Sequence, residues 1–378
     1  MSERFSLKDH LFNAGTLGQL ASEYASGIDG FDATAFLAEV LPGLEGRELK
    51  ERLEWIADCL EPWLSDDFPV MADQLEAAMS PPLDPTLGDD DFGQFIHAVP
   101  GILAVRHGLE NHRDRALDLL EAATQRFSME FYIRPFIDRW PDETLGRLDT
   151  WCGHRNYHVR RLVSEGTRPK LPWARKLSLD PIVPLRFLDR LFADATRYVT
   201  RSVANHLNDI AKINPGLVIA RLEDWAESGT QDRKEMAWIT SHALRGLIKE
   251  GHPGAMALLG YDPDAPLDAS VAIDPPDPEI GGDMELRVTL CAAADLPVLV
   301  DFIVHFRRPG GKISPKVFKL KQTTLRANRP QELTKRHRLR ADATTFTLVP
   351  GPHLIEVQVN GVVRAATQAE LQPAPLAE

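Results

Sequence analysis

The sequence is poor in cysteine and has no long hydrophobic run, and both absences narrow the class of protein. Its three cysteines, Cys59, Cys152 and Cys291, have no metal-type spacing and predict no disulfide framework. No run of about 18 apolar residues occurs, so we expect no transmembrane helix. Residues 1–15 carry charges and lack the apolar core of a signal peptide, which favours a cytoplasmic protein.

Common catalytic signatures are absent as well. There is no Gly-x-Gly-x-x-Gly, no Walker loop, no His-Glu-x-x-His and no Gly-x-Ser-x-Gly. Any chemistry must therefore depend on less familiar residues.

The net charge of the whole chain is negative, but positive charge is concentrated locally. The 378 residues have a net charge of −12. Residues 1–100 hold 5 Lys and Arg against 20 Asp and Glu, residues 151–214 hold 12 against 5, and residues 301–350 hold 12 against 3. Because DNA binding depends on local positive potential, the two basic regions could grip one polyanion. The alternative is two ordinary solvated faces.

The first 250 residues or so have a helical pattern. Apolar residues recur three to four apart in Leu49–Leu60, Arg113–Arg126 and Leu217–Ala226. Prolines and glycines interrupt this pattern at short intervals, as in Asn214–Pro215–Gly216. Helices joined by short turns indicate helical pairs.

A weak internal repeat supports this interpretation. A step of about 40 residues aligns Val159 with Val199 and then with Ile239, and this period is typical of HEAT-type helical pairs. Such pairs stack into a solenoid with a concave face. We therefore expect residues 1–258 to form a HEAT-like repeat domain suited to a long rigid ligand such as duplex DNA.

The composition changes after Gly260. Residues 259–282 are rich in Asp-Pro pairs and predict a linker. Beyond it, apolar and polar residues alternate, and Asn360–Gly361 is a strong signal for a two-residue hairpin. About six or seven short strands over residues 283–372 predict a small all-β, immunoglobulin-like sandwich.

Glu130, set among aromatic residues in Phe127-Ser-Met-Glu-Phe-Tyr-Ile-Arg-Pro-Phe136, is the first candidate for chemistry. Pro135 fixes a bend or a first helical turn here. A buried acid without a partner would be costly. The alternative to a chemical role is therefore a helix junction in which Glu130 caps a helix or pairs with Arg134.

The segment Arg160–Trp173 is the second candidate. It concentrates cations, a carboxylate and a tryptophan at a helix end closed by Gly166. Arg161 and Glu165 are four residues apart and share a helix face. The alternative is an i,i+4 salt bridge and a proline-stiffened turn, with Trp173 packed in the core.

A polar stripe on the next predicted helix is the third candidate. Arg201, Asn205 and Asp209 are each four residues apart, so they share one face. HEAT repeats also use arginine and aspartate ladders as structural features, which is the alternative here.

Two strings together carry a family resemblance. Met-Glu130-Phe-Tyr-Ile-Arg-Pro-Phe and Arg160-Arg-Leu-Val-Ser-Glu-Gly-Thr-Arg-Pro-Lys-Leu-Pro-Trp-Ala174 closely resemble the AlkC family of DNA alkylation-repair glycosylases. This family is a branch of the HEAT-like-repeat glycosylases that also includes AlkD. The resemblance covers nearly the whole chain, because some members carry an immunoglobulin-like domain after the solenoid. Met129 and Tyr132 stand where we expect smaller residues.

The resemblance implies a monofunctional DNA N-glycosylase of base excision repair. It would excise cationic alkylated bases, notably 3-methyladenine and 3-methylcytosine, with no metal and no nucleotide cofactor. It would bend double-stranded DNA and reach the sugar from the minor groove, without flipping the base into a pocket. We expect a monomer that binds alkylated DNA and no membrane.

The resemblance also implies roles for the candidate residues. Glu165 and Glu130 would stabilise an oxocarbenium-like sugar and position water, and Trp173 would face the charged base. Asp209 would be a third acid or would hold Arg201 or Asn205 in place. The side chains expected to contact DNA are Arg160, Arg161, Arg168, Lys170, Arg201, Asn205, Lys312, Lys316 and Arg336.

Two alternative hypotheses for the function remain. One is a non-catalytic HEAT-repeat protein that binds bent or branched DNA, and the presence of Glu130, Glu165 and Trp173 together argues against it. The other is a protein-binding scaffold, which predicts no salt-dependent affinity for DNA.

Overall fold

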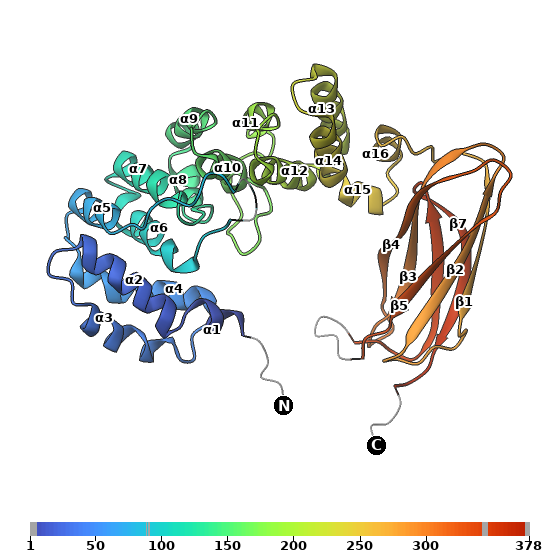
Figure 1. Ribbon diagram of the computed structural model, residues 1–378, viewed down its shortest axis with the longest axis horizontal. Coiled ribbons are helices and arrows are strands. Elements are labelled where there is room, and N and C mark those ends of the chain that lie inside the picture. Colours follow the sequence, from blue (N-terminus) through green and yellow to red (C-terminus); the bar gives the residue numbers. More distant parts are fainter. Residues whose placement is uncertain (1–5, 88, 90, 342–346, 375–378) are drawn as a thin grey trace. The chain divides into compact units, whose positions relative to one another are not determined.

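Amphipathic helices fill the first part of the chain and paired strands fill the last part (Figure 1). The computed structural model describes residues 6–87, 89, 91–341 and 347–374. The chain divides into a repeat unit, Met1–Ile210 with Trp225–Ala243, and a β unit, Ala211–Asp224 with Leu244–Glu378.

The helices follow the three-to-four spacing of apolar residues. The three segments predicted as helical are occupied by α4 (Leu49–Leu60), α7 (Arg113–Thr124) and α13 (Pro215–Ser228). None of the described helices has both the length and the apolar character needed to cross a bilayer. The other helices are α1 (Leu7–Leu11), α2 (Ala14–Gly27), α3 (Ala33–Val40), α5 (Phe68–Ala77), α6 (Val99–Leu103), α8 (Ile133–Arg139), α9 (Pro141–Trp151), α10 (Tyr157–Gly166), α11 (Leu185–Leu191), α12 (Arg197–Ala211), α14 (Arg233–Ala243), α15 (Arg245–Lys249) and α16 (Pro253–Leu258). Short 3-10 or π turns occur at Pro42–Leu44, Glu61–Trp63, Phe95–Ala98 and Ala104–Gly108.

The repeat predicted from the sequence is present in α10, α12 and α14. Val159, Val199 and Ile239 lie one in each of these helices and are fully buried. Because equivalent apolar positions recur about every 40 residues, each helical pair can bury the apolar face of its neighbour. The expectation of a helical-repeat solenoid is therefore confirmed.

Two antiparallel sheets form most of the β unit. One sheet has the order β1-β2-β5 and the other has the order β4-β3-β6-β7. The strands are β1 (Leu267–Asp274), β2 (Asp283–Ala292), β3 (Leu296–Arg307), β4 (Ile313–Leu325), β5 (Gln331–Arg338), β6 (Gly351–Val359) and β7 (Val362–Leu371).

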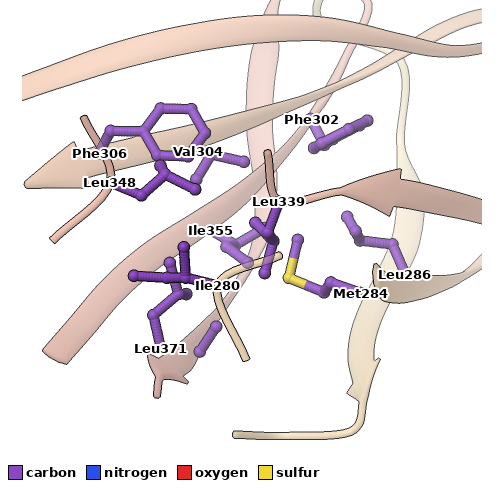
Figure 2. Packing of buried hydrophobic residues seen from close by; sticks show 11 residues of the cluster. Ile280, Met284, Leu286, Phe302, Val304, Phe306, Leu339, Leu348, Ile355 and Leu371 are labelled. Carbon is purple, nitrogen blue, oxygen red and sulfur yellow. The ribbon is translucent and has the colours of Figure 1, made fainter. Parts of the chain in front are cut away.

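Side chains from both sheets meet in a common core. Met284 and Leu286 of β2 pack with Phe302 of β3 and Ile355 of β6, as Figure 2 shows. Alternate residues of each strand point into this layer, which is the pattern of a sandwich. The predicted all-β sandwich is therefore confirmed.

The Asn360–Gly361 hairpin is also confirmed. Asn360 has φ 50° and Gly361 has φ 85°, which suits the two central residues of a type I′ turn between β6 and β7.

The predicted linker 259–282 needs a correction. Strand β1 occupies Leu267–Asp274 inside it and pairs with β2 along its whole length. Leu267, Val271 and Ile273 pack against the sandwich core. The flanking Asp-Pro pairs hide this strand, although the sequence from Leu267 does alternate between apolar and polar residues.

Candidate active site

Helix α10 begins and ends at defined residues. The side chain of Asn156 accepts a hydrogen bond from the backbone N–H of His158 at 2.8 Å, which caps its first turn. The helix ends at Gly166, where a Cβ atom would approach Cγ2 of Ile133 to 2.5 Å. Only glycine allows α10 and α8 to come this close. The contact brings Arg161 and Glu165 beside the segment that carries Glu130.

Five charged side chains form a row that joins α10, α12 and the segment before α8. Arg161 lies 2.8 Å from a carboxylate oxygen of Glu130 and 3.8 Å from one of Glu165. Arg168 lies 2.5 Å from Glu165 and 3.0 Å from Asp209. We call these five residues the carboxylate row. Its three carboxylates outnumber its two guanidinium groups, so the row would favour a further positive charge beside it.

Glu165 lies at the centre of the row and is almost completely buried. Its carboxylate also accepts a hydrogen bond from Oγ of Ser202 at 2.6 Å. Burial by itself would raise the pKa of Glu165, but the positive charges of Arg161 and Arg168 and the Ser202 hydrogen bond outweigh it. The net effect is a pKa below the usual value, so this carboxylate is ionised at neutral pH.

Glu130 lies at one end of the row and is slightly more accessible, with 15% of its side chain exposed. It accepts a hydrogen bond from Oγ of Ser128 at 2.6 Å and one from Arg161. The guanidinium of Arg161 lies 4.5 Å from the ring centre of Tyr198, within cation–π distance. The expected pairing of Arg161 with Glu165 is present at 3.8 Å, and Arg161 also reaches Glu130.

Arg134 does not pair with Glu130, so that alternative is wrong. Its guanidinium donates instead to the carbonyl oxygens of Gly166 at 3.0 Å, Arg168 at 2.9 Å and Arg175 at 2.7 Å. Arg134 is buried and satisfies three backbone acceptors of one loop. It therefore fixes the course of the loop that carries Trp173.

Trp173 is exposed, with 63% of its surface accessible, so the alternative in which it packs in the core is wrong. Its φ is 63°, in the left-handed region that is strained for a non-glycine residue. The ammonium group of Lys50 donates to its carbonyl oxygen. A large apolar side chain held outward by such contacts is typical of a binding surface.

Met129 and Tyr132, which are larger than expected, are accommodated by Gly101. A Cβ atom at Gly101 would approach Cδ2 of Tyr132 to 2.3 Å and Sδ of Met129 to 2.8 Å. The missing side chain makes room for both residues, so the segment around Glu130 keeps its place.

Several predicted DNA contacts lie outside the row. Arg160 pairs with Asp194 at 2.5 Å, and Arg201 pairs with Asp89 at 2.6 Å. Asn205 accepts a hydrogen bond from His242 at 2.9 Å, and the predicted stripe with Arg201 and Asp209 does lie on α12. Lys170 is exposed on the loop after α10.

The predicted basic residues of the β unit do not share one surface. Lys316 is paired in register with the core residue Val304, so its side chain starts on the inner face of its sheet. Arg336 lies on the outer face of the other sheet, 77% exposed and 2.5 Å from Asp283. Lys312 is exposed between β3 and β4.

Three polar residues beside the carboxylate row were missed at the level of sequence: Ser128, Ser202 and His206. His206 is fully buried and donates from Nδ1 to the carbonyl oxygen of Ser164 at 3.0 Å. Burial and the charge of Arg168 lower the pKa of His206 to about 3, so it is neutral. The repeat offers a signal for Ser202, because it follows Glu165 by 37 residues, close to one period. Among the residues that the structure describes, no group of three or more His, Cys, Asp or Glu could hold a metal ion.

Comparisons with known proteins extend over both parts of the chain. A family model described as the C-terminal Ig-like domain of the uncharacterised protein YhaZ matches residues 268–373. YhaZ of Bacillus subtilis is 35% identical over 257 residues, which are 67% of this chain and 71% of that protein. The structure of the alkylpurine DNA glycosylase AlkC of Pseudomonas fluorescens, bound to DNA containing an abasic site analog, is 32% identical. It aligns with a TM-score of 0.85 over 97% of this chain and 100% of that one.

Proposed function

The chain belongs to the AlkC family of HEAT-like-repeat DNA alkylation-repair glycosylases, as a member with a C-terminal immunoglobulin-like domain, and we propose that it removes cationic alkylated bases from double-stranded DNA. The observation that carries this proposal is the carboxylate row, a buried set of three carboxylates and two guanidinium groups. The likeness to a glycosylase solved on DNA supports it. We propose 3-methyladenine and 3-methylcytosine as the bases removed.

The reaction suits an anionic site without a general acid. A base methylated at N3 already carries a positive charge. When the bond from C1′ of the sugar to the base nitrogen breaks, its electron pair passes to the base, which leaves neutral. The sugar is left as an oxocarbenium-like cation, and water then adds to C1′ and gives its proton to a carboxylate or to solvent. A carboxylate beside C1′ would stabilise this cation and orient the water.

Glu165 and Glu130 are the carboxylates that we propose for stabilising the cation and orienting the water. The lowered pKa of Glu165 keeps it anionic, as stabilisation of a cation requires. Glu130 is the more accessible of the two and shares Arg161 with Glu165. Asp209 is bound to Arg168, so we propose that it positions this arginine beside Glu165.

Trp173 and the surrounding cations would recognise the lesion and its strand. An exposed indole attracts a cationic base through its π face more strongly than a neutral one. Arg201 and the exposed Lys170 would face phosphates of the damaged strand, whereas Arg161 and Arg168 are held by the carboxylates of the row. We propose that the duplex is bent toward this surface and that the base is not flipped into an enclosed pocket before cleavage.

Release of free base from methylated duplex DNA tests the function. We expect the wild-type protein to release 3-methyladenine, and the Glu165→Gln variant to release it about 100-fold to 1,000-fold more slowly, since one preorganised charge is lost. Glu130→Gln offers a second variant at a less buried position. DNA binding and thermal unfolding, measured on each variant, show whether the fold survives.

The control is Glu143→Gln, at a half-exposed position in the first turn of α9 that pairs with Arg113. It should release base at the wild-type rate. A wild-type protein that binds DNA but releases no alkylated base would instead be a non-catalytic DNA-binding member. A rate unchanged in both Glu165→Gln and Glu130→Gln would remove the two carboxylates from the mechanism.

A further inference from the structure

An open cavity of about 220 Å³ lies beside Trp173 within the repeat unit. Its walls include the aromatic side chains of Phe95, Phe127, Phe131 and Tyr132. One water needs only about 10–15 Å³ of such space, so the cavity has room for a planar ring system. Phe95, Phe131 and Tyr132 remain partly accessible to solvent, whereas Phe127 is buried.

The carboxylate row does not use this cavity. Glu130 lies between Phe127 and Phe131 in sequence, but its carboxylate turns to Arg161 and is not among the lining groups. The short segment from Phe127 to Phe131 therefore contributes Glu130 to the carboxylate row and its aromatic rings to the wall of the cavity.

Polar groups stand at the rim of the aromatic walls. Lys50 and Glu54 lie one turn apart on α4, and both line the cavity. The ammonium group of Lys50 binds the carbonyl of Trp173 and lies 5.5 Å from the ring centre of Phe131. The carboxylate of Glu54 is 57% exposed and can accept a hydrogen bond from an amino group. Flat apolar faces with a few polar groups at the edge fit a heteroaromatic ring.

The rim is also fixed in place. Arg134 lines the cavity and holds the loop from Gly166 to Arg175 through three carbonyl oxygens. Trp173, on that loop, lines the cavity while remaining exposed. A base that faces Trp173 at the moment of cleavage would therefore have the cavity directly beside it.

We infer that this cavity binds the released alkylated base, a neutral planar heteroaromatic ring, after the bond to the sugar has broken. The inference rests on the proposed function, and it adds a product site to it. Binding forms and breaks no covalent bond. The bound free base would occupy the surface beside Trp173, so it would inhibit the next round of cleavage.

The test uses the full chain and free 3-methyladenine as the probe. Without DNA, titration calorimetry should detect saturable binding to the wild-type protein. In the base-release assay, added 3-methyladenine should slow the reaction in competition with methylated DNA. Leu49→Trp places a large ring at the half-buried edge of the cavity and should weaken both effects at least tenfold.

Val70→Trp is the matched control, because Val70 is 45% exposed on α5 and does not line the cavity. It should bind the base and be inhibited as the wild type is. If Leu49→Trp fails to fold, Phe131→Ala, which removes one wall, replaces it. Wild-type protein that releases base but neither binds free 3-methyladenine nor is inhibited by it overturns the product site and leaves the proposed function standing. Wild-type protein that binds the free base but releases none overturns the proposed function, and with it the role of the cavity as a product site.

Discussion

Arg161 and Arg168 each pair with two carboxylates. The burial of each charged side chain in the row is therefore compensated by the opposite charge of its neighbours. Glu165 loses its hydration on burial and regains interaction energy only from the two guanidinium groups and Ser202. Removing one partner of such a buried set leaves an uncompensated charge, which typically costs about 3–5 kcal/mol. The same arrangement keeps Glu165 ionised without contact to bulk water.

His206 gives a pH dependence with a definite sign. Its pKa falls from 6.5 to about 3 because it is fully buried. Between these values the unfolded chain binds a proton that the folded chain does not, so stability is kept above pH 6.5 and is lost as the pH falls toward 3. From pH 7 to pH 5 this amounts to about 2 kcal/mol at 1.36 kcal/mol per pKa unit.

Urea unfolding of the wild type and of His206→Gln, each at pH 7 and pH 5, checks this. The wild type should lose about 2 kcal/mol more than the variant between the two pH values. His158, whose pKa is lowered in the same direction, is present in both proteins and cancels. Equal losses would mean that His206 titrates normally in the folded protein.

Residue types in the candidate site could be predicted from sequence, but their partners could not. Arg161 and Glu165 lie in one helix, so their four-residue spacing predicts their contact correctly. Glu130 and Arg134 have the same spacing, yet α8 begins only at Ile133, so they share no helix face. The outward position of Trp173 depends on Lys50 and Arg134, which are distant in sequence.

Neighbouring helices are tied together by polar contacts at the spacing of the repeat. Ser202 of α12 donates to Glu165 of α10 across 37 residues, and His242 of α14 donates to Asn205 of α12 across 37 residues. The period alone predicts which helices are adjacent. The sequence can therefore indicate which helices such contacts join. Strand β1 shows the opposite case, since its edge position depends on pairing with β2 rather than on a strong local signal.

Ser202→Ala tests the tie between α10 and α12. It removes a hydrogen bond to a buried carboxylate, so the free energy of unfolding should fall by about 1.5–3 kcal/mol. Ser22→Ala, which affects only an exposed contact to the carbonyl of Gly18, should change it by no more than about 0.5 kcal/mol. A double-mutant cycle of Ser202→Ala with Glu165→Gln should give a coupling of at least about 0.5 kcal/mol. Additive effects would show that the Ser202 bond does not support Glu165.

At the scale of the whole chain, much of the acidic charge of residues 1–100 is used between helices. Arg106 contacts Glu54, Asp58 and Glu61, and Arg115 contacts two further acids, Asp73 and Glu76. These ion pairs leave less negative charge to repel DNA than the count of residues suggests. The net charge of −12 is therefore a poor guide to the partners of this protein.

The β unit carries two distinct basic surfaces, and their relative contributions to DNA binding can be measured. A hollow between its sheets is lined by Lys316, Arg338 and Arg340 together with Phe306 and Phe318, and Arg338 lies 3.4 Å from Asp283. On the outer face, Arg336 already has Asp283 at 2.5 Å, which lowers its attraction for a phosphate.

Because Arg340 is exposed at this hollow, we expect Arg340→Ala, in the full chain, to weaken DNA binding more than Arg336→Ala does. Each phosphate contact that is lost should reduce the slope of log K against log salt by about 0.9. Fluorescence anisotropy with a methylated duplex at several salt concentrations measures both quantities. Arg336→Ala is the matched control, since it removes one cation from the same unit but from its outer face. An equal or larger loss of slope in Arg336→Ala would place the phosphates on the outer sheet, and an unchanged slope in all variants would mean that neither surface of this unit contacts the DNA backbone.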